Sequence, residues 1–301
     1  MQNKPFISII LPTYNRLYSL KKIFLPSLEM QIFSNYELIV IDDHSSDRTR
    51  SFFLDEIKKY FPQVSDHVRY FRNKKNIGAP ASRNRGSENA KGEWIYVTED
   101  DVQIDEPLFL KKTYEILKNT KKNVAVVSPK RMESNISGYY KNPKNSFVRV
   151  GKISGEIYLD PTQEYSGYVE NTHASSFIRR NVFLEHKEDE VVFFGNTFRD
   201  ETDLYYRIVK SGKKIWYCGD VLKTLHRNDF AKRGGQKKIA SKSLLERDFM
   251  EIKNHYQYLK KNSFSFPFFR GLVYFFVRWT KHFSNISRLY FLKNFLSKIA
   301  L

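Results

Sequence analysis

Four apolar, β-branched segments that alternate with helix-like segments constrain the fold of this chain more than any other feature. Between these segments, apolar residues recur at a spacing of three and four, which is typical of helices packed on one face. Strands that alternate with helices predict a parallel sheet built from right-handed βαβ units. We therefore expect an α/β fold. The four strand-like segments are Phe6–Leu11, Glu37–Ile41, Val68–Phe71 and Trp94–Val97.

The remaining elements are expected from the same two periodicities, and Pro26 should interrupt the first helix. Residues 128–172 are polar and carry only short strand-like pieces at Phe147–Val150 and Glu156–Leu159. The first helix is expected to end near Gln31, and four more are expected at Thr49–Phe61, Ala79–Ala90, Ser176–Glu185 and Ser241–Lys260. Further strands are expected at Val124–Val127, Lys214–Tyr217 and Val221–His226.

Acidic residues follow two of the strand-like segments directly. Asp43 lies after the second, and Glu99, Asp100 and Asp101 follow the fourth. The carboxyl ends of parallel strands share one edge of a sheet, where ligands bind in open α/β folds. Three adjacent carboxylates repel one another unless a cation or hydrogen-bond donors neutralise them. The pattern predicts a site for a divalent cation with oxygen ligands, Mg²⁺ or Mn²⁺ in type. A solvated acidic turn before the next helix is the alternative.

The charge of the chain is strongly positive and unevenly distributed. The 301 residues include 51 Lys and Arg against 33 Asp and Glu, a formal net charge of +18. After Glu251 there are nine basic residues and no acidic ones. Such a balance indicates a polyanionic partner: a nucleic acid, an anionic membrane or a phosphorylated substrate.

Cysteine content and hydropathy indicate the cellular compartment in which the protein is expected to fold. Cys218 is the only cysteine, so an internal disulfide and a cysteine-rich metal site are both excluded, as expected in a reducing cytoplasm. The apolar segment at the N-terminus is too short for a signal peptide. No stretch reaches the roughly 18 to 20 uncharged apolar residues that span a bilayer.

Five segments, in this order, resemble an inverting family 2 glycosyltransferase with a GT-A fold, over roughly residues 5–228. The resemblance implies a Rossmann-like, mostly parallel central sheet flanked by helices, to which this chain adds a C-terminal helical extension. The segments are PTYNR (Pro12–Arg16), VIDDHSSDRT (Val40–Thr49), NIGAPASRNRG (Asn76–Gly86), GEWIYVTEDD (Gly92–Asp101) and FRDETDLYYRIVKSGKKIWY (Phe198–Tyr217), the last followed by His226.

The resemblance implies a nucleoside diphosphate sugar as donor and assigns residues to its parts. Pro12 and Tyr14 belong to the segment that binds the nucleotide, with Tyr14 against the base. Asp43 would accept the uracil N3–H. Arg83, near a helix start, would contact phosphate oxygens.

The segment that resembles the family's metal motif departs from Asp-x-Asp, because Thr98 stands where the first acid is usual. We expect Asp100 to bind the metal directly and Asp101 to serve as a second or alternate ligand. Glu99 would lie toward the ribose or a metal-bound water. The resemblance also implies that His226 returns to the metal, which suits Mn²⁺.

The catalytic base of the family is an acid in the segment that begins Asp200-Glu201-Thr-Asp-Leu here. The second acid is the base in the usual order, which indicates Glu201, with Asp200 as the second choice. A carboxylate in this position takes the proton of the acceptor hydroxyl. The simpler interpretation is that these acids stabilise a helix N-terminus.

The domain organisation follows from the motifs and the charge. We expect a catalytic domain over residues 1–228, divided into a nucleotide-sugar half (about 1–128) and an acceptor half (about 129–228). A basic loop and a helix follow at residues 229–262. Residues 263–301 form an aromatic, basic amphipathic tail, with Arg270, Arg278, Lys281 and Arg288 on one side of a helix. Such a tail suits an anionic membrane surface, or packs on the catalytic domain or a second subunit.

The expected function is metal-dependent, inverting sugar transfer, with UDP-sugar as the donor type and a lipid-linked or cell-surface glycan as acceptor. The expected location is the cytoplasmic face of the cell membrane, and the oligomeric state stays open. A sugar nucleotidyltransferase is one alternative, although PTYNR does not resemble its glycine-rich signature. A nucleic-acid-binding protein is the other, but we expect no nucleic acid, because the basic charge gathers at an aromatic tail.

Overall fold

The computed structural model describes residues 4–104, 106–134, 149–150, 157–158, 165–193, 199–227 and 244–280. Nine of its strands form one sheet, and a short hairpin lies apart from it. The strands of the sheet are β1 (Ile7–Thr13), β2 (Tyr36–Asp42), β3 (Val68–Arg72), β4 (Trp94–Val97), β5 (Val102–Ile104), β6 (Val124–Ser134), β9 (Ser166–Val169), β10 (Phe177–Arg179) and β11 (Lys214–Arg227); the hairpin is β7 (Arg149–Val150) and β8 (Ile157–Tyr158).

The sheet is mostly parallel, as expected. Its order is β3-β2-β1-β4-β10-β6-β11-β5, with β9 also paired to β11. Strands β1 to β4 pair in parallel, and so do β6 and β11, whereas β10 is antiparallel to both β4 and β6. The helix expected from Ser176 is therefore wrong in its first turn, because Phe177–Arg179 complete the sheet. A short apolar run fits a buried strand and a helix equally well.

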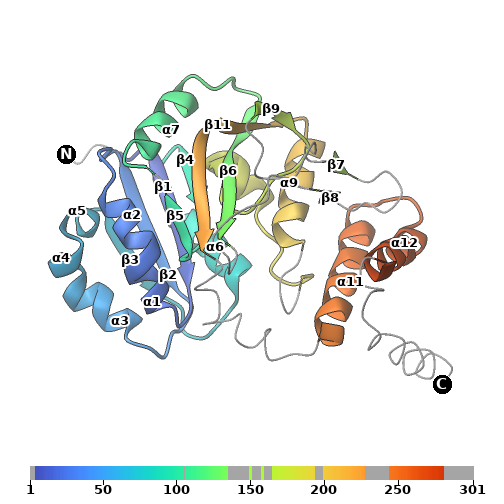
Figure 1. Cartoon of the computed structure of the whole chain (residues 1–301), viewed down its shortest axis with the longest axis horizontal. Coiled ribbons are helices and arrows are strands. Elements are labelled where there is room, and N and C mark those ends of the chain that lie inside the picture. Colours follow the sequence, from blue (N-terminus) through green and yellow to red (C-terminus); the bar gives the residue numbers. More distant parts are fainter. Residues whose placement is uncertain are drawn as a thin grey trace.

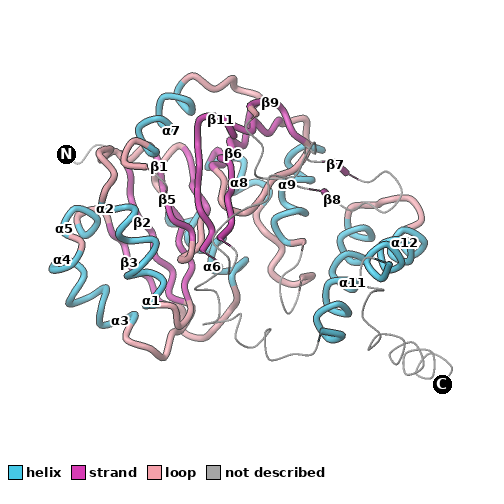
Figure 2. Tube along the Cα trace, in the orientation of Figure 1, coloured by secondary structure: helices cyan, strands magenta, loops and turns pink. Residues whose placement is uncertain are grey.

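Helices cover both faces of the sheet. Because side chains alternate along a strand, Ile9 of β1 packs on one face while Ile10 packs on the other. The first face is covered by α1 (Leu17–Ser19), η1 (Leu20–Phe24), α2 (Leu25–Glu29), α3 (Thr49–Ser51), η2 (Phe52–Glu56), α4 (Ile57–Tyr60), α5 (Pro62–Ser65) and α7 (Phe109–Lys118). The second is covered by α6 (Ala79–Asn89), α8 (Arg180–His186) and α9 (Asp200–Lys210). Figures 1 and 2 show the sheet between these two layers.

Helix α6 lies unusually close to the sheet at Gly86. A Cβ at this position would lie 2.5 Å from Cγ2 of Ile10 and 3.3 Å from Cγ1 of Ile41. Both isoleucines are fully buried, so neither can move away cheaply. The missing side chain brings the helix that carries Arg83 against β1 and β2.

Replacing Gly86 by alanine should therefore destabilise the protein, by about 1–3 kcal/mol from overpacking. The free energy of unfolding in urea measures the effect. Glu88→Ala, at an exposed position of the same helix, is the matched control and should cost no more than about 0.5 kcal/mol. Equal stability of Gly86→Ala and the native protein would contradict this close approach.

Two further helices lie at one end of the molecule, opposite α3–α5: α11 (Leu244–Lys261) and α12 (Pro267–Thr280). They pack side by side, with Tyr274 stacked on His255 at 4.0 Å between ring centroids. The end of α11 is anchored to α9, because Lys261 Nζ and Asn262 Nδ2 each lie 2.7 Å from the buried carboxylate of Asp203.

The tail therefore begins as a helix packed on the rest of the protein. Within the described residues, none of the helices has the length and apolar character that crossing a bilayer requires. Lys281, Arg288 and the basic loop at residues 232–238 lie outside the described residues, as does the side chain of Arg278.

Candidate active site

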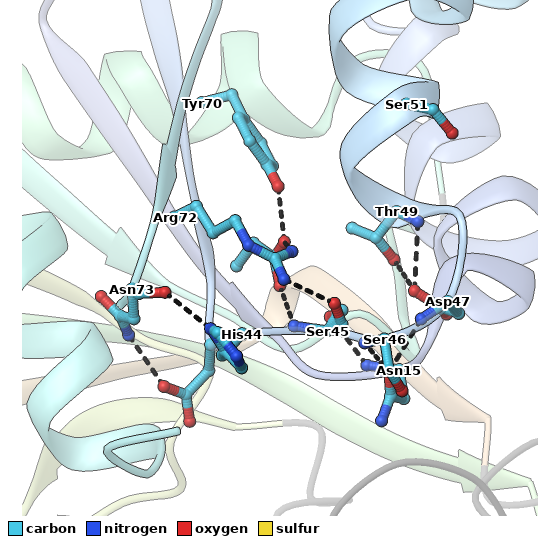
Figure 3. Close-up of polar contacts among 12 residues, drawn as sticks. Asn15, His44, Ser45, Ser46, Asp47, Thr49, Ser51, Tyr70, Arg72 and Asn73 are labelled. Atoms are coloured by element: carbon cyan, nitrogen blue, oxygen red, sulfur yellow. Dashed lines mark hydrogen bonds and ion pairs between the residues drawn. The ribbon is translucent and has the colours of Figure 1, made fainter. Parts of the chain in front are cut away.

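The loops that follow β1 and β2 are joined by their own polar groups. Asn15 Oδ1 accepts hydrogen bonds from the amides of Ser46 at 2.6 Å and Asp47 at 3.2 Å, and the amide of Asn15 donates to Ser45 Oγ at 2.9 Å. Figure 3 shows Asn15 beneath this turn. Asn15 has a φ of 55°, which asparagine tolerates better than most residues. These contacts hold the segment that contains Pro12 and Tyr14, both half-buried, beside the end of β2.

The two adjacent aspartates at the end of β2 have different environments. Asp42 accepts hydrogen bonds from Tyr70 and, at 2.6 Å, from Arg72. Burial alone would raise its pKa, but the bonds from Ser45 and Tyr70 and the charge of Arg72 lower it. Asp42 therefore has a structural role.

Asp43 instead holds the loop before α6. Its carboxylate accepts bonds from Asn73 Nδ2 at 2.8 Å, the Ile77 amide at 2.8 Å and the Gly78 amide at 2.9 Å. Gly78 has a φ of +88°, a conformation that favours glycine. Asp43 thus lies at the rim of the sheet, the edge after β1 and β2 where a nucleotide base is expected. Its carboxylate is bound there by the amides of the loop before α6.

The acids after β4 point to different partners. Asp100 accepts bonds from Thr13 Oγ1 at 2.9 Å and Arg16 Nε at 2.5 Å, and is buried. Arg16 also forms an ion pair with Asp101 through Nη2 of the same guanidinium. Burial raises the pKa of the Asp100 carboxyl group to about 7, although the charge of Arg16 opposes the rise. Burial alone would also raise the pKa of Asp101, but the hydrogen bond from His226 and the charge of Arg16 outweigh it and lower that pKa to about 2. Arg16 thus supplies the positive charge that these adjacent carboxylates require.

Three groups converge where a cation could bind. Ligand atoms of Glu99, Asp101 and His226 all lie within 4.8 Å of one another. Arg131 Nη2 lies 2.8 Å from His226 Nδ1, and because arginine only donates, this nitrogen accepts while Nε2 carries the ring proton. A cation that binds His226 would therefore have to displace either Arg131 or this proton. Two carboxylates and one imidazole fit the preferences of Mn²⁺, and less fully those of Mg²⁺. Asp100, the first choice from the sequence, is not a member of this group.

The acids of the fifth motif begin α9. Asp200 is 1% exposed and accepts a bond from Arg83 Nη2 at 2.6 Å, and its other oxygen accepts the Glu201 amide at 2.7 Å. Glu201 is partly exposed. Burial raises the pKa of the Glu201 carboxyl group well above its usual range, and Asp200 and Glu99 add to the rise while Arg83 opposes it. The charge of Glu99 therefore acts on the Glu201 carboxyl group, which links the two acids electrostatically.

Arg83 lies near the start of α6, as expected, but its partners are two carboxylates. Its guanidinium is buried between Glu188 and Asp200, with Glu188 contacts of 2.6 to 2.9 Å. Two carboxylates occupy the group that was expected to contact phosphate. Its role as a phosphate ligand stays a prediction.

Sequence reasoning missed Arg16, Arg131 and Glu188. Arg16 stands in the PTYNR segment, so three consecutive acids could have prompted a search for it. Nothing near Glu188 or Arg131 in the sequence marks them. His173 is 4% exposed, and its Nε2 lies 2.8 Å from the Pro129 carbonyl oxygen.

The family model described as glycosyl transferase family 2 matches residues 8–187, more than half of the chain. The chain belongs to this family. The match begins in β1 and ends beside Glu188, so it includes the donor-side motifs but stops before α9.

Three curated relatives share part of the chain. GalNAc(5)-diNAcBac-PP-undecaprenol beta-1,3-glucosyltransferase of Campylobacter jejuni is 34% identical over 33% of this chain and 31% of its own length. The putative colanic acid biosynthesis glycosyl transferase WcaA of Escherichia coli is 35% identical, covering 34% of each chain. Poly(ribitol-phosphate) beta-N-acetylglucosaminyltransferase TarP of Staphylococcus aureus is 37% identical over 32% of this chain and 28% of its own. The matches therefore span about a third of each relative.

Solved structures show the fold. TarS 1–349 of S. aureus is 17% identical with a TM-score of 0.52, over 86% of this chain and 72% of that one. A mannosyltransferase of Pyrobaculum calidifontis, solved with GDP-Man and Mn²⁺, is 15% identical with a TM-score of 0.57, over 87% of this chain and 65% of its own. The fold is GT-A, as the sequence resemblance implied.

Proposed function

We propose that this protein is a metal-dependent, inverting glycosyltransferase that moves a sugar from a nucleoside diphosphate sugar, UDP-sugar in type, to a hydroxyl group of a lipid-linked or cell-surface glycan. The observation that supports the proposal is the group of Glu99, Asp101 and His226, to which Glu201 is linked by the charge of Glu99 and Asp43 by the contacts of Thr13. Asp43 and Asp100 meet there through Thr13, whose carbonyl accepts the Asp43 amide at 2.8 Å while its hydroxyl binds Asp100.

The donor side is supported by relatives and by the chain itself. TarS has been solved with UDP-GlcNAc, at 17% identity and a TM-score of 0.54 to this chain. We assign the base to the rim formed by Pro12, Tyr14 and Asp43. Family membership argues against a sugar nucleotidyltransferase and against a nucleic-acid-binding protein.

We propose that Asp101 and His226 hold the metal, with Glu99 as a third ligand or a contact to the ribose. This assignment replaces Asp100, whose carboxylate faces Arg16 and Thr13. A divalent cation bound there would stabilise the charge that develops on the departing diphosphate. Arg16 keeps the neighbouring carboxylates ordered.

Glu201 is the proposed general base. The acceptor hydroxyl gives its proton to the Glu201 carboxylate, its oxygen forms a bond to the anomeric carbon, and the bond from that carbon to the diphosphate oxygen breaks. The electron pair of that bond leaves with the nucleoside diphosphate. A base on the side opposite the leaving group produces inversion.

Thermal unfolding with a panel of UDP, GDP, UDP-sugars and GDP-Man, each with and without Mn²⁺, tests the donor class. We expect UDP compounds to raise the melting temperature, and Mn²⁺ to enlarge the rise. A rise with GDP-Man alone would contradict the UDP assignment. No rise with any nucleotide would contradict the proposed function.

The face of α12 that does not pack on α11 supports a peripheral position on the inner face of the cell membrane. Phe268, Phe269 and Phe276 of α12 are 69%, 60% and 56% exposed, and Phe266, which directly precedes the helix, is 78% exposed. Exposed aromatics of this density mark an interaction surface. The nine basic residues after Glu251, with no acid among them, favour an anionic bilayer as the occupant.

Replacing Phe268 and Phe269 together by serine should weaken binding to vesicles that contain phosphatidylglycerol by about tenfold or more. Each phenylalanine that becomes buried in the bilayer would contribute about 1.5–3 kcal/mol to binding. Sedimentation measures the bound fraction. Ile32→Ser, which removes an equally exposed apolar side chain beyond α2, is the control. Equal binding of the double variant, or equal binding to neutral phosphatidylcholine vesicles, would contradict the membrane assignment.

A further inference from the structure

Two consecutive residues of α6, Arg83 and Asn84, bind both the side chain and the backbone of Glu188. Arg83 binds both oxygens of the Glu188 carboxylate, at 2.6 to 2.9 Å. Asn84 binds its backbone, donating to the Glu188 carbonyl at 2.9 Å and accepting the Glu188 amide at 2.9 Å. Side chain and backbone of Glu188 are therefore fixed to one turn of one helix.

The same guanidinium reaches the first turn of α9. Arg83 Nη2 bridges Glu188 Oε2 and Asp200 Oδ2, each at 2.6 Å, and Asp200 Oδ1 in turn accepts the amide of Glu201. The side chains of Arg83, Glu188 and Asp200 are each at most 5% exposed. A planar guanidinium donates in fixed directions, so it sets the orientation of both carboxylates.

Helix α6 is also joined to the nucleotide rim. Ser82 Oγ accepts a bond from Asn73 Nδ2 at 3.0 Å, and the same amide group donates to Asp43 at 2.8 Å. Ser82 and Arg83 are adjacent, so one turn of α6 contacts both the Asp43 loop and the start of α9. The two regions are separated in sequence by more than one hundred residues.

We propose that Arg83 and Glu188 are positioning residues that fix the first turn of α9, and with it the Glu201 carboxylate, relative to the nucleotide rim. As far as it concerns sugar transfer, this inference rests on the proposed role of Glu201. Burial raises the pKa of Glu188, and the charge of Arg83 opposes the rise. A buried charge that loses its partner is strongly destabilising, so the arrangement tolerates little change.

Two variants test the clamp formed by Arg83 and Glu188. Arg83→Lys keeps the charge but cannot reproduce the bridging geometry, and Glu188→Gln keeps the shape but removes the charge. We expect amide hydrogen exchange in residues 199–206 to rise about tenfold in Arg83→Lys and less in Glu188→Gln. We expect the Kd for UDP with Mn²⁺ to change less than about threefold, and kcat for UDP release from a UDP-sugar to fall by about 100-fold, with little change in KM.

The matched control is Glu88→Gln. It breaks an exposed ion pair between the same two segments, Lys187 Nζ to Glu88 Oε1 at 2.6 Å, which should contribute little. Exchange in α9 and UDP release should stay unchanged in this variant. Exchange in α7 serves as the reference for general loosening of the fold.

Three results would overturn the proposal. Unchanged α9 exchange in Arg83→Lys would show that no clamp exists. An equal rise in α7 and α9 would show a general structural role. A tenfold loss of UDP affinity with unchanged α9 exchange would make Arg83 a diphosphate ligand. If Glu201→Gln instead retained turnover, the proposed function would fail, while the exchange data would still decide the clamp.

Discussion

Glu201→Gln is expected to abolish sugar transfer while leaving donor binding intact. Glutamine has nearly the same shape as glutamate and keeps one acceptor oxygen, but it cannot take the proton of the acceptor hydroxyl. Loss of a general base typically costs about 10²- to 10⁴-fold in rate. The nucleotide is expected to contact Asp43 and the metal, so its affinity should not depend on Glu201.

Release of UDP from a UDP-sugar, followed with and without a glycan acceptor, measures the loss, and calorimetry with UDP and Mn²⁺ measures donor binding. Glu185→Gln, at an exposed position of α8, is the control and should behave as the native protein. Asp200→Asn is the informative comparison, because Asp200 is buried against Arg83 and should act only through position. Normal turnover in Glu201→Gln, with a large loss in Asp200→Asn, would transfer the role of base to Asp200.

Asp101→Asn should have the largest effect on metal-dependent binding. The substitution removes a charged ligand atom from the group shared with Glu99 and His226, all within 4.8 Å. Replacing even an indirect partner of a metal ligand typically costs about 10- to 100-fold in affinity, so we expect at least about a tenfold loss of Mn²⁺ affinity here. UDP affinity should then no longer respond to Mn²⁺.

Asp100→Asn separates the two neighbouring carboxylates. Asp100 binds Arg16 and Thr13, so its loss should lower the melting temperature while much of the Mn²⁺ response remains. Calorimetric titration of Mn²⁺ in the presence of UDP distinguishes the two variants, with the exposed Asp55→Asn as control. Loss of the response in Asp100→Asn and its retention in Asp101→Asn would return the direct metal contact to Asp100.

Apolar periodicity alone predicts the class of fold and the edge of the sheet at which the candidate site is expected. The first four strands follow from apolar runs of four to six residues, and the intervening helices from a spacing of three and four. Polar residues after Ile41 and Val97 had to meet at one edge, because parallel strands end on the same side. The placement of Glu201 in the first turn of α9 followed from the apolar face formed by Leu204, Ile208 and their neighbours.

The partners of the individual acids, in contrast, depend on contacts between segments that are far apart in the sequence. Beyond the end of β4 the chain leaves the regular alternation of a strand, so the turn determines whether Asp100 or Asp101 faces the His226 side chain. Arg83 and Glu188 lie 105 residues apart, and no local pattern links them. The antiparallel β10 likewise depends on pairing with β4 and β6, not on its own three residues. Local periodicity reports which side of an element is buried, whereas ion pairs between distant segments depend on how the layers pack.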